Sequence, residues 1–421
     1  QRERGVCDVP LVRFWRRSGD CSKGWGMTNG ELPLSGVTVI DLSRLFPGSY
    51  GTLLLSALGA TVIKVEDTGG GDGIRDMLKF EGNPESAGHL MLNRGKQSVS
   101  VNLKDSRGQQ LLLRLISEAH VLVDSFRPGV LDRLGLGSAE LLEANPSLVH
   151  VSITAFGQTG EYRHRPAHDL NSVGYAGLLG LARDLDGKAA MPRLQNADLS
   201  AGLHAAVAVL AGLRVATRDG VPYRADIAMN ETAASLLALQ NATVAGTGQS
   251  PPVPDYLTGA IACYSIYETA DGECITVAGL EPKFFARMCE LIGRPDLTAR
   301  QYDVAGQGEL RDELAAIFES RPRQYWLDLL AGEDTCVGPA LSVTDALAEA
   351  QPRQRGAVTL AEFSDGQRVS AFRVIPWEQR TDNSERAPGL GEHTSLVLAE
   401  IGVTPEQLER LIASGVVRPP S

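Results

Sequence analysis

The alternation of short apolar runs with helix-like segments constrains this chain more than any other feature. From about residue 36, β-branched runs end at loops and are followed by stretches with helical periodicity. Continuous Val/Ile/Leu runs separated by helices are typical of buried parallel strands. We expect strands over 37–42, 61–65, 98–103, 120–124, 148–155 and 223–229, and helices over 49–58, 108–119 and 200–216. The pattern predicts an α/β fold with an open, mostly parallel, Rossmann-like sheet covered on both faces.

Length favours two domains over one. The chain has 421 residues and is 43% hydrophobic, enough to bury a large core. The predicted parts are a leader or extension (1–26), a large domain (27–230), a linker (231–255), a smaller α+β domain (256–354) and a tail (355–421) that returns to the large domain. A hairpin pattern over 262–277, followed by helical stretches, gives the small domain its α+β class. Gly, Pro, Thr and Ser concentrated over 241–256 indicate the linker.

Charge and cysteine usage exclude several classes of function. The net charge of −11 argues against a general nucleic-acid-binding surface. The six cysteines form no CxxC pair and no Cys/His cluster with metal-ligand spacing, so we expect free thiols in a reducing, cytoplasmic compartment and no metal. From the sequence we expect no apolar run that approaches the length of a membrane span, and the leader lacks the apolar core of a secretory signal. We therefore expect no membrane partner.

Ligands of open parallel sheets bind beyond the carboxyl ends of the strands, so the loops there matter most. The turn Leu45–Ser49 opens a helix whose free N–H groups can face an anion or a thioester carbonyl. Gly69–Gly73 lacks phosphate-loop spacing and is interpreted as a flexible surface loop. Arg127 and Arg133 place cations near another strand end, where either phosphate contacts or solvated loop charges fit the pattern.

The most informative stretch runs from 155 to 171. A strand ends in a Gly-rich loop that delivers His168 and Asp169 at the start of an apolar helix. Histidine titrates near neutral pH and therefore suits proton transfer. Asp198 precedes a second, long helix, and Glu281 opens a helix of the small domain. Taken alone, both acids could equally well serve helix starts.

Ten short pieces in this order resemble the class III CoA-transferase superfamily, and within it the α-methylacyl-CoA racemases. The resemblance runs from about Leu34 to Thr394. The matching pieces are Phe46-Pro-Gly48, Leu58-Gly-Ala60, Arg94-Gly-Lys96, Phe126-Arg-Pro-Gly-Val130, Phe156-Gly-Gln-x-Gly160, His168-Asp-x-Asn171, Ala270-Asp-Gly272, Glu281-Pro-x-Phe284, Cys336-Val-x-Pro339 and Gly391-Glu-His-Thr394.

The resemblance implies two different reactions at one site. In the racemases a His-Asp pair stands where this chain has His168 and Asp169, a second aspartate stands at Asp198, and a supporting glutamate at Glu281. An enzyme of this kind interconverts (R)- and (S)-2-methylacyl-CoA by removing and returning the α-proton. In the transferases the aspartate at Asp169 attacks the thioester and forms an anhydride. A third alternative is a CoA-binding homologue without catalytic activity.

The resemblance further implies where the substrate binds and how subunits assemble. The implied CoA or acyl contacts are Pro47, Gly48, Val101, Asn102, Leu103, Lys104, Arg127, Arg133, Ala167, Leu170 and Asn171. The partners implied are an acyl-CoA, which is the substrate, and a second copy of the chain in an interlocked homodimer whose sites are shared between domains. No cofactor is expected. Departures from the racemase pattern occur at Asp67, Ala167 and Ser172.

Racemisation explains why these residue types are needed. A weakly acidic C–H proton is removed from one face of the α-carbon and returned to the other, so two groups flank the carbon, each acting as base in one direction and acid in the other. His168 and Asp198 meet that need. Backbone N–H groups near Asp169–Asn171 would stabilise the charge on the thioester oxygen, and Glu281 would orient the imidazole.

Overall fold

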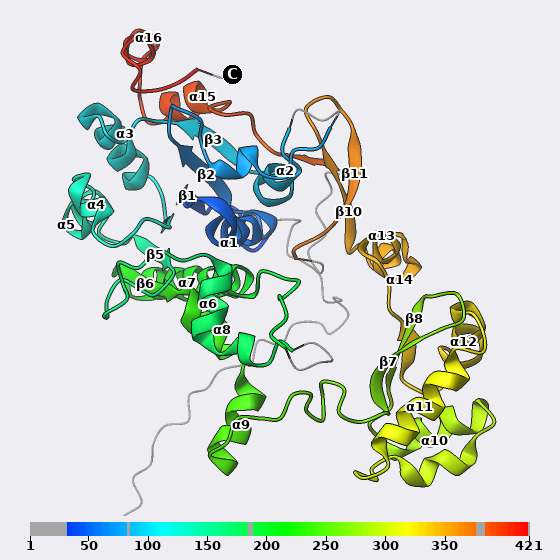
Figure 1. Cartoon of the computed structure of the whole chain (residues 1–421). Coiled ribbons are helices and arrows are strands. Elements are labelled where there is room, and N and C mark those ends of the chain that lie inside the picture. Colours follow the sequence, from blue (N-terminus) through cyan, green and yellow to red (C-terminus); the bar gives the residue numbers. More distant parts are fainter. Residues whose placement is uncertain (1–31, 82–84, 184–187, 376–383, 420–421) are drawn as a thin grey trace, which may run out of the picture.

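The computed structural model describes residues 32–81, 85–183, 188–375 and 384–419. Its largest unit is a six-stranded sheet in which every neighbouring pair is parallel (Figure 1). The strands are β1 (Thr38–Leu42), β2 (Thr61–Glu66), β3 (Gln97–Ser100), β4 (Val121–Asp124), β5 (Val149–Thr154) and β6 (Tyr223–Ala228), in the order β3-β2-β1-β4-β5-β6. The predicted Rossmann-like fold is confirmed, and the strand order reverses between β1 and β4.

Helices cover both faces of this sheet, as the alternating apolar runs predict. The helices of this region are α1 (Leu45–Ala57), α2 (Ala87–Asn93), α3 (Ser106–Ser117), α4 (Val130–Arg133), α5 (Ser138–Ala144), α6 (Asp169–Ala176), α7 (Asn196–Asp219) and α8 (Met229–Ser235), with short 3₁₀ turns at Gly73–Asp76 and Leu178–Gly180. Val39, Val123 and Val151 point to the layer formed by α1 and α7. Ile40 and Leu122 point to the layer of α3 and α5. Alternate side chains of each strand therefore fill two separate cores.

Two glycines let α1 and α7 approach closely. A Cβ atom at Gly51 would lie 2.9 Å from the carbonyl oxygen of Gly202, and one at Gly202 would lie 2.7 Å from that of Pro47. Backbone therefore packs directly on backbone, and any larger residue would force the helices apart. This contact sets the position of the first turns of α7 relative to the β1–α1 loop.

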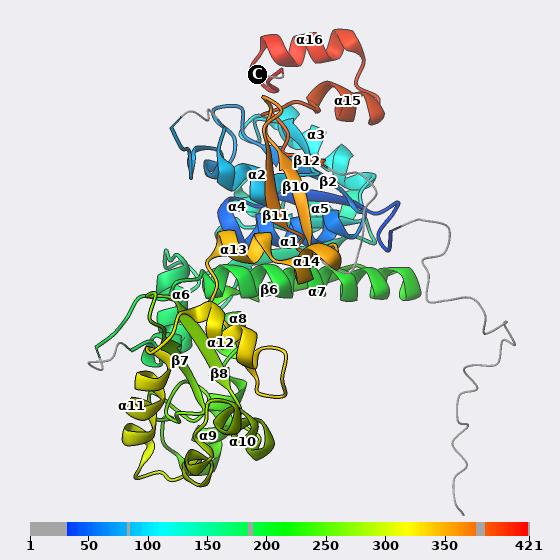
Figure 2. The same ribbon diagram turned by 90° about the vertical axis from the view of Figure 1, so that its right-hand side faces the viewer.

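Helix α7 is longer and more apolar than the sequence analysis suggested. It begins at Asn196 rather than Ser200, and its 24 residues meet the length and hydropathy of a membrane span. The expectation that no apolar run is long enough was wrong, because polar residues at the helix start were assigned to a loop. In the structure α7 lies along the sheet domain (Figure 2), where Ala201, Ala205 and Val209 are buried in its core.

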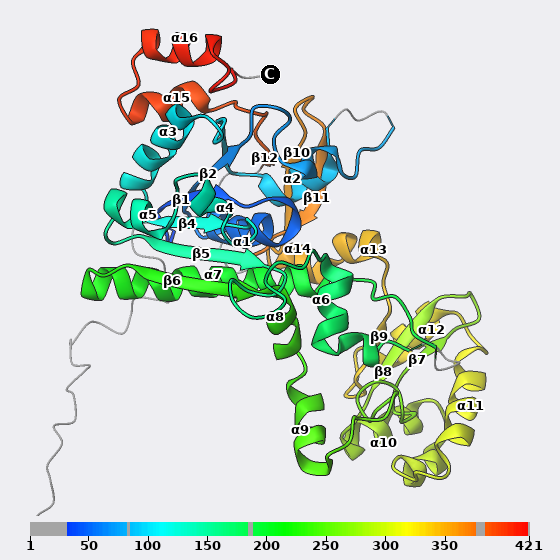
Figure 3. The same cartoon turned by 60° about the vertical axis from the view of Figure 1, so that its left-hand side comes forward.

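The smaller unit is α+β, as predicted. Its antiparallel sheet has β7 (Tyr264–Glu268), β8 (Cys274–Ala278) and β9 (Val337–Pro339), and its helices are α10 (Pro282–Leu291), a 3₁₀ turn (Pro295–Arg300), α11 (Gln307–Phe318) and α12 (Arg323–Leu330). Phe285, Phe318 and Trp326 fill a core of their own. This unit lies to one side of the sheet domain (Figure 3), which leaves the carboxyl ends of the large sheet uncovered by it within one chain.

The connections differ in part from the prediction. Most of the predicted linker 231–255 is helical, in α8 and in α9 (Ala238–Thr247), because its Ala/Leu-rich first half favours helix. The last part of the chain contains α13 (Val343–Ala348), α14 (Ala350–Gln354), a sheet of β10 (Val358–Glu362), β11 (Arg368–Phe372) and β12 (Ser384–Arg386), α15 (Thr394–Glu400) and α16 (Pro405–Ala413). Its end lies against β3, where the N–H of Asn102 donates to the carbonyl of Val416. The leader 1–26 lies outside the described residues.

Candidate active site

His168 stands at the start of α6, as predicted. It is the N-cap residue of that helix, with an extended backbone, and its N–H donates to Oδ1 of Asn171 at 3.2 Å. The His168 carbonyl accepts from the N–H groups of Asn171 and Ser172, which closes the first turn. The imidazole is exposed to solvent. The loop after β5 therefore presents a solvent-accessible imidazole on a backbone that is held by hydrogen bonds.

Asp169 connects this helix to α7. Its Oδ1 accepts hydrogen bonds from the backbone N–H groups of Ala197 at 2.7 Å and Asp198 at 3.1 Å. These are orphan donors of the first turn of α7, whose own N-cap, Gln195, makes no side-chain hydrogen bond there. Asp169 thus caps a helix that starts 27 residues later in the chain. Because His168 precedes Asp169, this contact places the start of α6, with His168, beside the first turn of α7, which carries Asp198.

Asp198 lies inside the first turn of α7 and not before it, which corrects the predicted helix start. Its carboxyl is half-buried. Burial, together with the negative charge of Asp169, raises the pKa of Asp198 from 3.8 to about 7. A helix-cap role is not supported, since Asp169 binds the N–H groups that such a cap would bind. A carboxyl with a pKa near neutrality can both accept and donate a proton.

The raised pKa of Asp198 has a consequence for stability. Between about pH 4 and pH 7 the folded protein holds a proton that the unfolded chain releases, so the free energy of unfolding falls as pH rises through this range. Replacing Asp198 with asparagine removes this loss. We expect the melting temperature of Asp198→Asn to exceed that of the wild type at pH 8 by several degrees, and the difference to shrink toward pH 4.

The control for this prediction is Asp219→Asn, at the other end of α7. Asp219 is exposed, and hydrogen bonds from Arg218 lower its pKa, so neutralising it offers no such gain. Differential scanning calorimetry at both pH values makes the comparison. Equal shifts for the two variants at pH 8 would contradict the raised pKa of Asp198.

The starts of α6 and α7 converge at this point. In the part of the chain that the structure describes, the backbone N–H groups of Asp169 and Leu170 donate to no protein acceptor. Free N–H groups at a helix start carry partial positive charge. Such groups can stabilise an oxygen that gains negative charge. The N–H of Asn171, which lies in the predicted range 169–171, instead donates to the carbonyl of His168.

The cations predicted to bind CoA lie at the carboxyl ends of β3 and β4. Lys104, Arg127 and Arg133 are exposed, and within the described ranges none has a carboxylate within ion-pair distance. Uncompensated cations at this edge favour a phosphorylated ligand. The described residues contain no group of three His, Cys, Asp or Glu side chains that could hold a metal ion.

The remaining predicted contacts at β3 have partners within the protein. Val101 is 1% exposed and bridges to Val417. The side chain of Asn102 accepts from the N–H of Lys104, and the carbonyl of Leu103 accepts from Gln109. These residues shape the loop on which Lys104 stands.

Pro47 and Gly48 lie in the first turn of α1, which begins at Leu45 and not at residue 49 as predicted. Proline is tolerated there because the first N–H groups of a helix need no helical acceptor. A Cβ atom at Gly48 would lie 2.1 Å from that of Ser43, so only glycine fits. Both residues are buried, and the exposed rim of the loop is formed by Arg44 and Leu45.

The structure shows what surrounds each residue that departs from the racemase pattern. Asp67 forms an ion pair with Arg44 at 3.3 Å, and its carboxylate also accepts from the N–H groups of Gly69 and Gly70. Ser172 is fully buried on the inner face of α6, whereas Ala167 is partly exposed beside His168. Substitution at Ser172 therefore changes the core of α6 more than the exposed face of the site.

Glu281 is not brought to the site within one chain. It is the N-cap residue of α10 in the small domain and is exposed. Among the described residues, no hydrogen bond joins Glu281 to His168 or Asp198. Figure 1 shows α10 and α6 in different parts of the molecule.

Comparisons with known proteins agree with this architecture. The model of CoA-transferase family III matches residues 34–394, and the chain belongs to this family. It is 30% identical to mouse α-methylacyl-CoA racemase over 91% of this chain and 97% of that protein. It is 32% identical to mouse succinyl-CoA:glutarate CoA-transferase over 96% and 97%. A CAIB/BAIF family protein from Brucella suis has a similar structure, with a TM-score of 0.76 and 29% identity over 88% of this chain and 100% of that one. Both enzymatic activities thus occur among relatives of similar identity.

Proposed function

We propose that the protein is an acyl-CoA racemase that interconverts (R)- and (S)-2-methylacyl-CoA. The observation that carries the proposal is the placement of Asp198, with its pKa near 7, on the helix that Asp169 ties to His168. Two proton-transfer groups from separate elements are what the reaction needs. A nucleophilic transfer needs only one carboxylate.

The proposed reaction balances as two proton transfers. In one direction His168 takes the α-proton, the C–H electron pair moves into the carbon–carbon bond of an enolate, and the protonated carboxyl of Asp198 returns a proton to the opposite face. In the other direction the two exchange roles. The N–H groups of Asp169 and Leu170 stabilise the thioester oxygen of the enolate. Lys104, Arg127 and Arg133 bind the CoA phosphates, and the reaction as written requires no cofactor.

CoA transfer through Asp169 is the second candidate. It is favoured by the transferase among the relatives and by the position of Asp169 beside the free helix N–H groups. Against it, one oxygen of Asp169 already accepts two hydrogen bonds, which stabilise the carboxylate and reduce its nucleophilicity.

Incubation with a 2-methylacyl-CoA in deuterated water, with and without an added carboxylic acid, separates the candidates. Deuterium uptake at the α-carbon without the acid supports the racemase. CoA transfer to the added acid without α-exchange supports the transferase. Binding of CoA with neither activity indicates the inactive homologue.

We also propose that two chains form an interlocked homodimer in which the small domain of one completes the site of the other. Apolar side chains exposed along α7 to α9 support a surface that a second chain covers. Five of them are 44–64% exposed: Leu203, Val207, Leu236, Leu239 and Val244. Such a dimer would let Glu281 meet His168 of the partner. Light scattering after size-exclusion chromatography is expected to give twice the chain mass of 44.9 kDa. A mass of one chain would contradict the shared site.

A further inference from the structure

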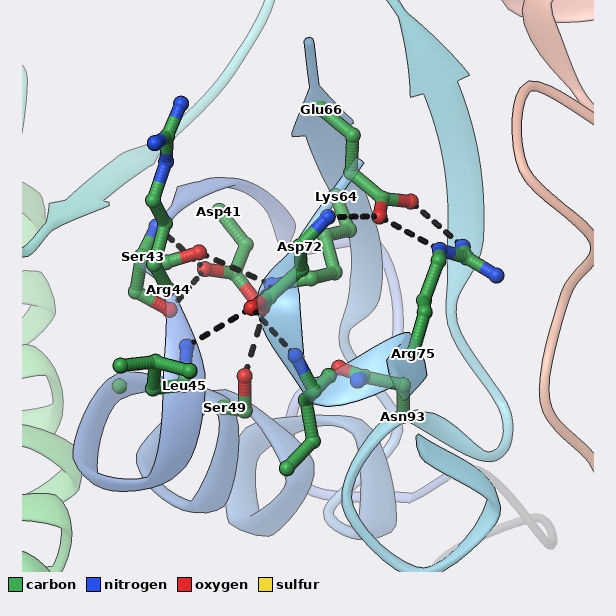
Figure 4. A network of polar contacts seen from close by, with 12 residues as sticks. Asp41, Ser43, Arg44, Leu45, Ser49, Lys64, Glu66, Asp72, Arg75 and Asn93 are labelled. Atoms are coloured by element: carbon green, nitrogen blue, oxygen red, sulfur yellow. Dashed lines mark hydrogen bonds and ion pairs between the residues drawn. The ribbon is translucent and has the colours of Figure 1, made fainter. Parts of the chain in front are cut away.

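Four charged side chains without a role in the proposed reaction lie buried behind the loop that joins β1 to α1. The side chains of Asp41, Lys64 and Lys96 are fully buried, and that of Asp72 is 1% exposed. Asp41 and Lys64 are register partners on the adjacent strands β1 and β2. Figure 4 shows Asp41, Lys64 and Asp72 converging on this loop.

Lys64 and Asp72 hold the first part of the loop. The Lys64 ammonium lies 2.8 Å from Oδ2 of Asp72 and donates to the carbonyl of Ser43 at 2.9 Å. Oδ1 of Asp72 accepts from the backbone N–H of Leu45 at 2.9 Å. The two side chains thus bind the main chain on both sides of Arg44.

Lys96 and Asp41 hold the second part. The Lys96 ammonium donates to the carbonyl of Ser49 at 3.0 Å and to Oγ1 of Thr52 at 2.7 Å. It also lies 3.2 Å from Oδ2 of Asp41, which accepts from Thr52 at 2.6 Å. The first turns of α1 are therefore fixed from beneath by side chains of β1 and of the loop before β3.

Burying four charged side chains is an unfavourable way to fill a core, because each charge loses its hydration. Two acids and two lysines balance in charge. Removing charges from water is nevertheless unfavourable, and apolar residues of equal size would often stabilise the fold as well. Burial lowers the pKa of Lys96 to about 8, and Asp41 only partly opposes this. Burial alone would raise the pKa of Asp41, but Lys64 and Lys96 lower it to about 2. Stability alone does not explain such an arrangement.

The loop that the network holds is strained and lies at the switch point of the sheet. Leu45 has a left-handed backbone, with φ of 61°, which is costly for a residue other than glycine. The N–H of Arg44 donates to Ser125 Oγ, which joins the β1 loop to the β4 loop across the point where strand order reverses. Ligands of such sheets bind there, and strained residues cluster at ligand sites.

We propose that Asp41, Lys64, Asp72 and Lys96 are positioning residues for substrate binding: they hold the β1–α1 loop in the strained conformation that receives acyl-CoA. This inference rests on the proposed acyl-CoA substrate. The network acts before ligand arrives, so its loss weakens binding more than it slows turnover at saturation.

Asp72 offers the sharpest test, because its side chain holds both Leu45 and Lys64. In Asp72→Ala both contacts are lost, and we expect the Kd for CoA, measured by titration calorimetry on the full chain, to rise about tenfold. Asp72→Asn keeps an acceptor for the Leu45 N–H but leaves Lys64 without its nearest counter-charge. The Kd of this variant for CoA is expected to rise roughly threefold. If the alanine variant does not fold, Asp72→Asn is measured in its place.

The matched control is Asn145→Ala. Asn145 is also buried and also binds loop backbone, by donating to the carbonyls of Ile116 and Ala119. It does so before the amino ends of β4 and β5, away from the carboxyl ends of the strands. We expect this variant to melt at a lower temperature with an unchanged Kd for CoA. An unchanged Kd in Asp72→Ala or, if that variant does not fold, in Asp72→Asn would overturn the positioning role while leaving the proposed function intact. Failure of the wild type to bind CoA would overturn both.

Discussion

Replacing His168 or Asp198 with alanine is expected to slow α-proton exchange by roughly 100-fold or more, while CoA binding stays nearly unchanged. Each variant removes one of two groups that together move a proton across the α-carbon. The CoA contacts proposed for Lys104, Arg127 and Arg133 lie on other loops and would be retained. Deuterium uptake into 2-methylacyl-CoA measures exchange, and titration with CoA measures binding.

The loop before α6 and the far end of α7 each supply a matched control for these variants. His164 is an exposed histidine four residues before His168, and its ring accepts a hydrogen bond from Arg163. Asp219 is an exposed aspartate at the far end of α7. Alanine at either control position is expected to leave exchange as in the wild type. Wild-type exchange in the His168 or Asp198 variant would refute the two-base assignment.

Replacing Asp169 with asparagine is expected to abolish one candidate reaction, CoA transfer, and to leave the other, α-proton exchange, largely intact. An amide oxygen can still accept from the N–H groups of Ala197 and Asp198, so α7 keeps its position and α-proton exchange persists within about tenfold of the wild type. Formation of an anhydride requires the carboxylate, so CoA transfer would be abolished. The ratio of exchange to transfer in this variant is therefore diagnostic.

The same variant should alter the pH dependence of exchange. The negative charge of Asp169 is one of the two causes that raise the pKa of Asp198. Removing it lowers that pKa, so the limb of the pH–rate profile due to Asp198 moves to lower pH, whichever epimer is supplied. An exchange profile that does not move would contradict the assignment of this limb to Asp198, and loss of all activity would instead favour Asp169 as the nucleophile.

The sheet and the local setting of His168 could be predicted because both depend on nearby sequence. Runs such as Val149–Thr154 are apolar and β-branched, and the chain enters α6 directly from the Gly-rich loop. Helix starts were predicted less well. Pro47 and Asp198 are residues typical of loops, yet both suit the first turn of a helix, so α1 and α7 begin earlier than expected.

Contacts between distant residues could not be predicted in this way. Nothing local shows that Asp169 caps α7, and this contact is what places the start of α6 beside the first turn of α7. The buried network was missed for the same reason. Lys64 lies in a run predicted as a buried strand, but only the register of β1 and β2 reveals Asp41 beside it. One signal was present: a lysine in the middle of the apolar run Thr61–Glu66.

One measurement tests the central claim most directly. Stereochemically pure (S)-2-methylacyl-CoA is incubated with the wild-type enzyme in deuterated water, without any acceptor acid, and both epimers are recovered and analysed by mass spectrometry. The two-base account predicts that the (R) epimer accumulates to about an equal amount and carries deuterium at the α-carbon. Recovery of the (S) epimer alone, without deuterium, would contradict it.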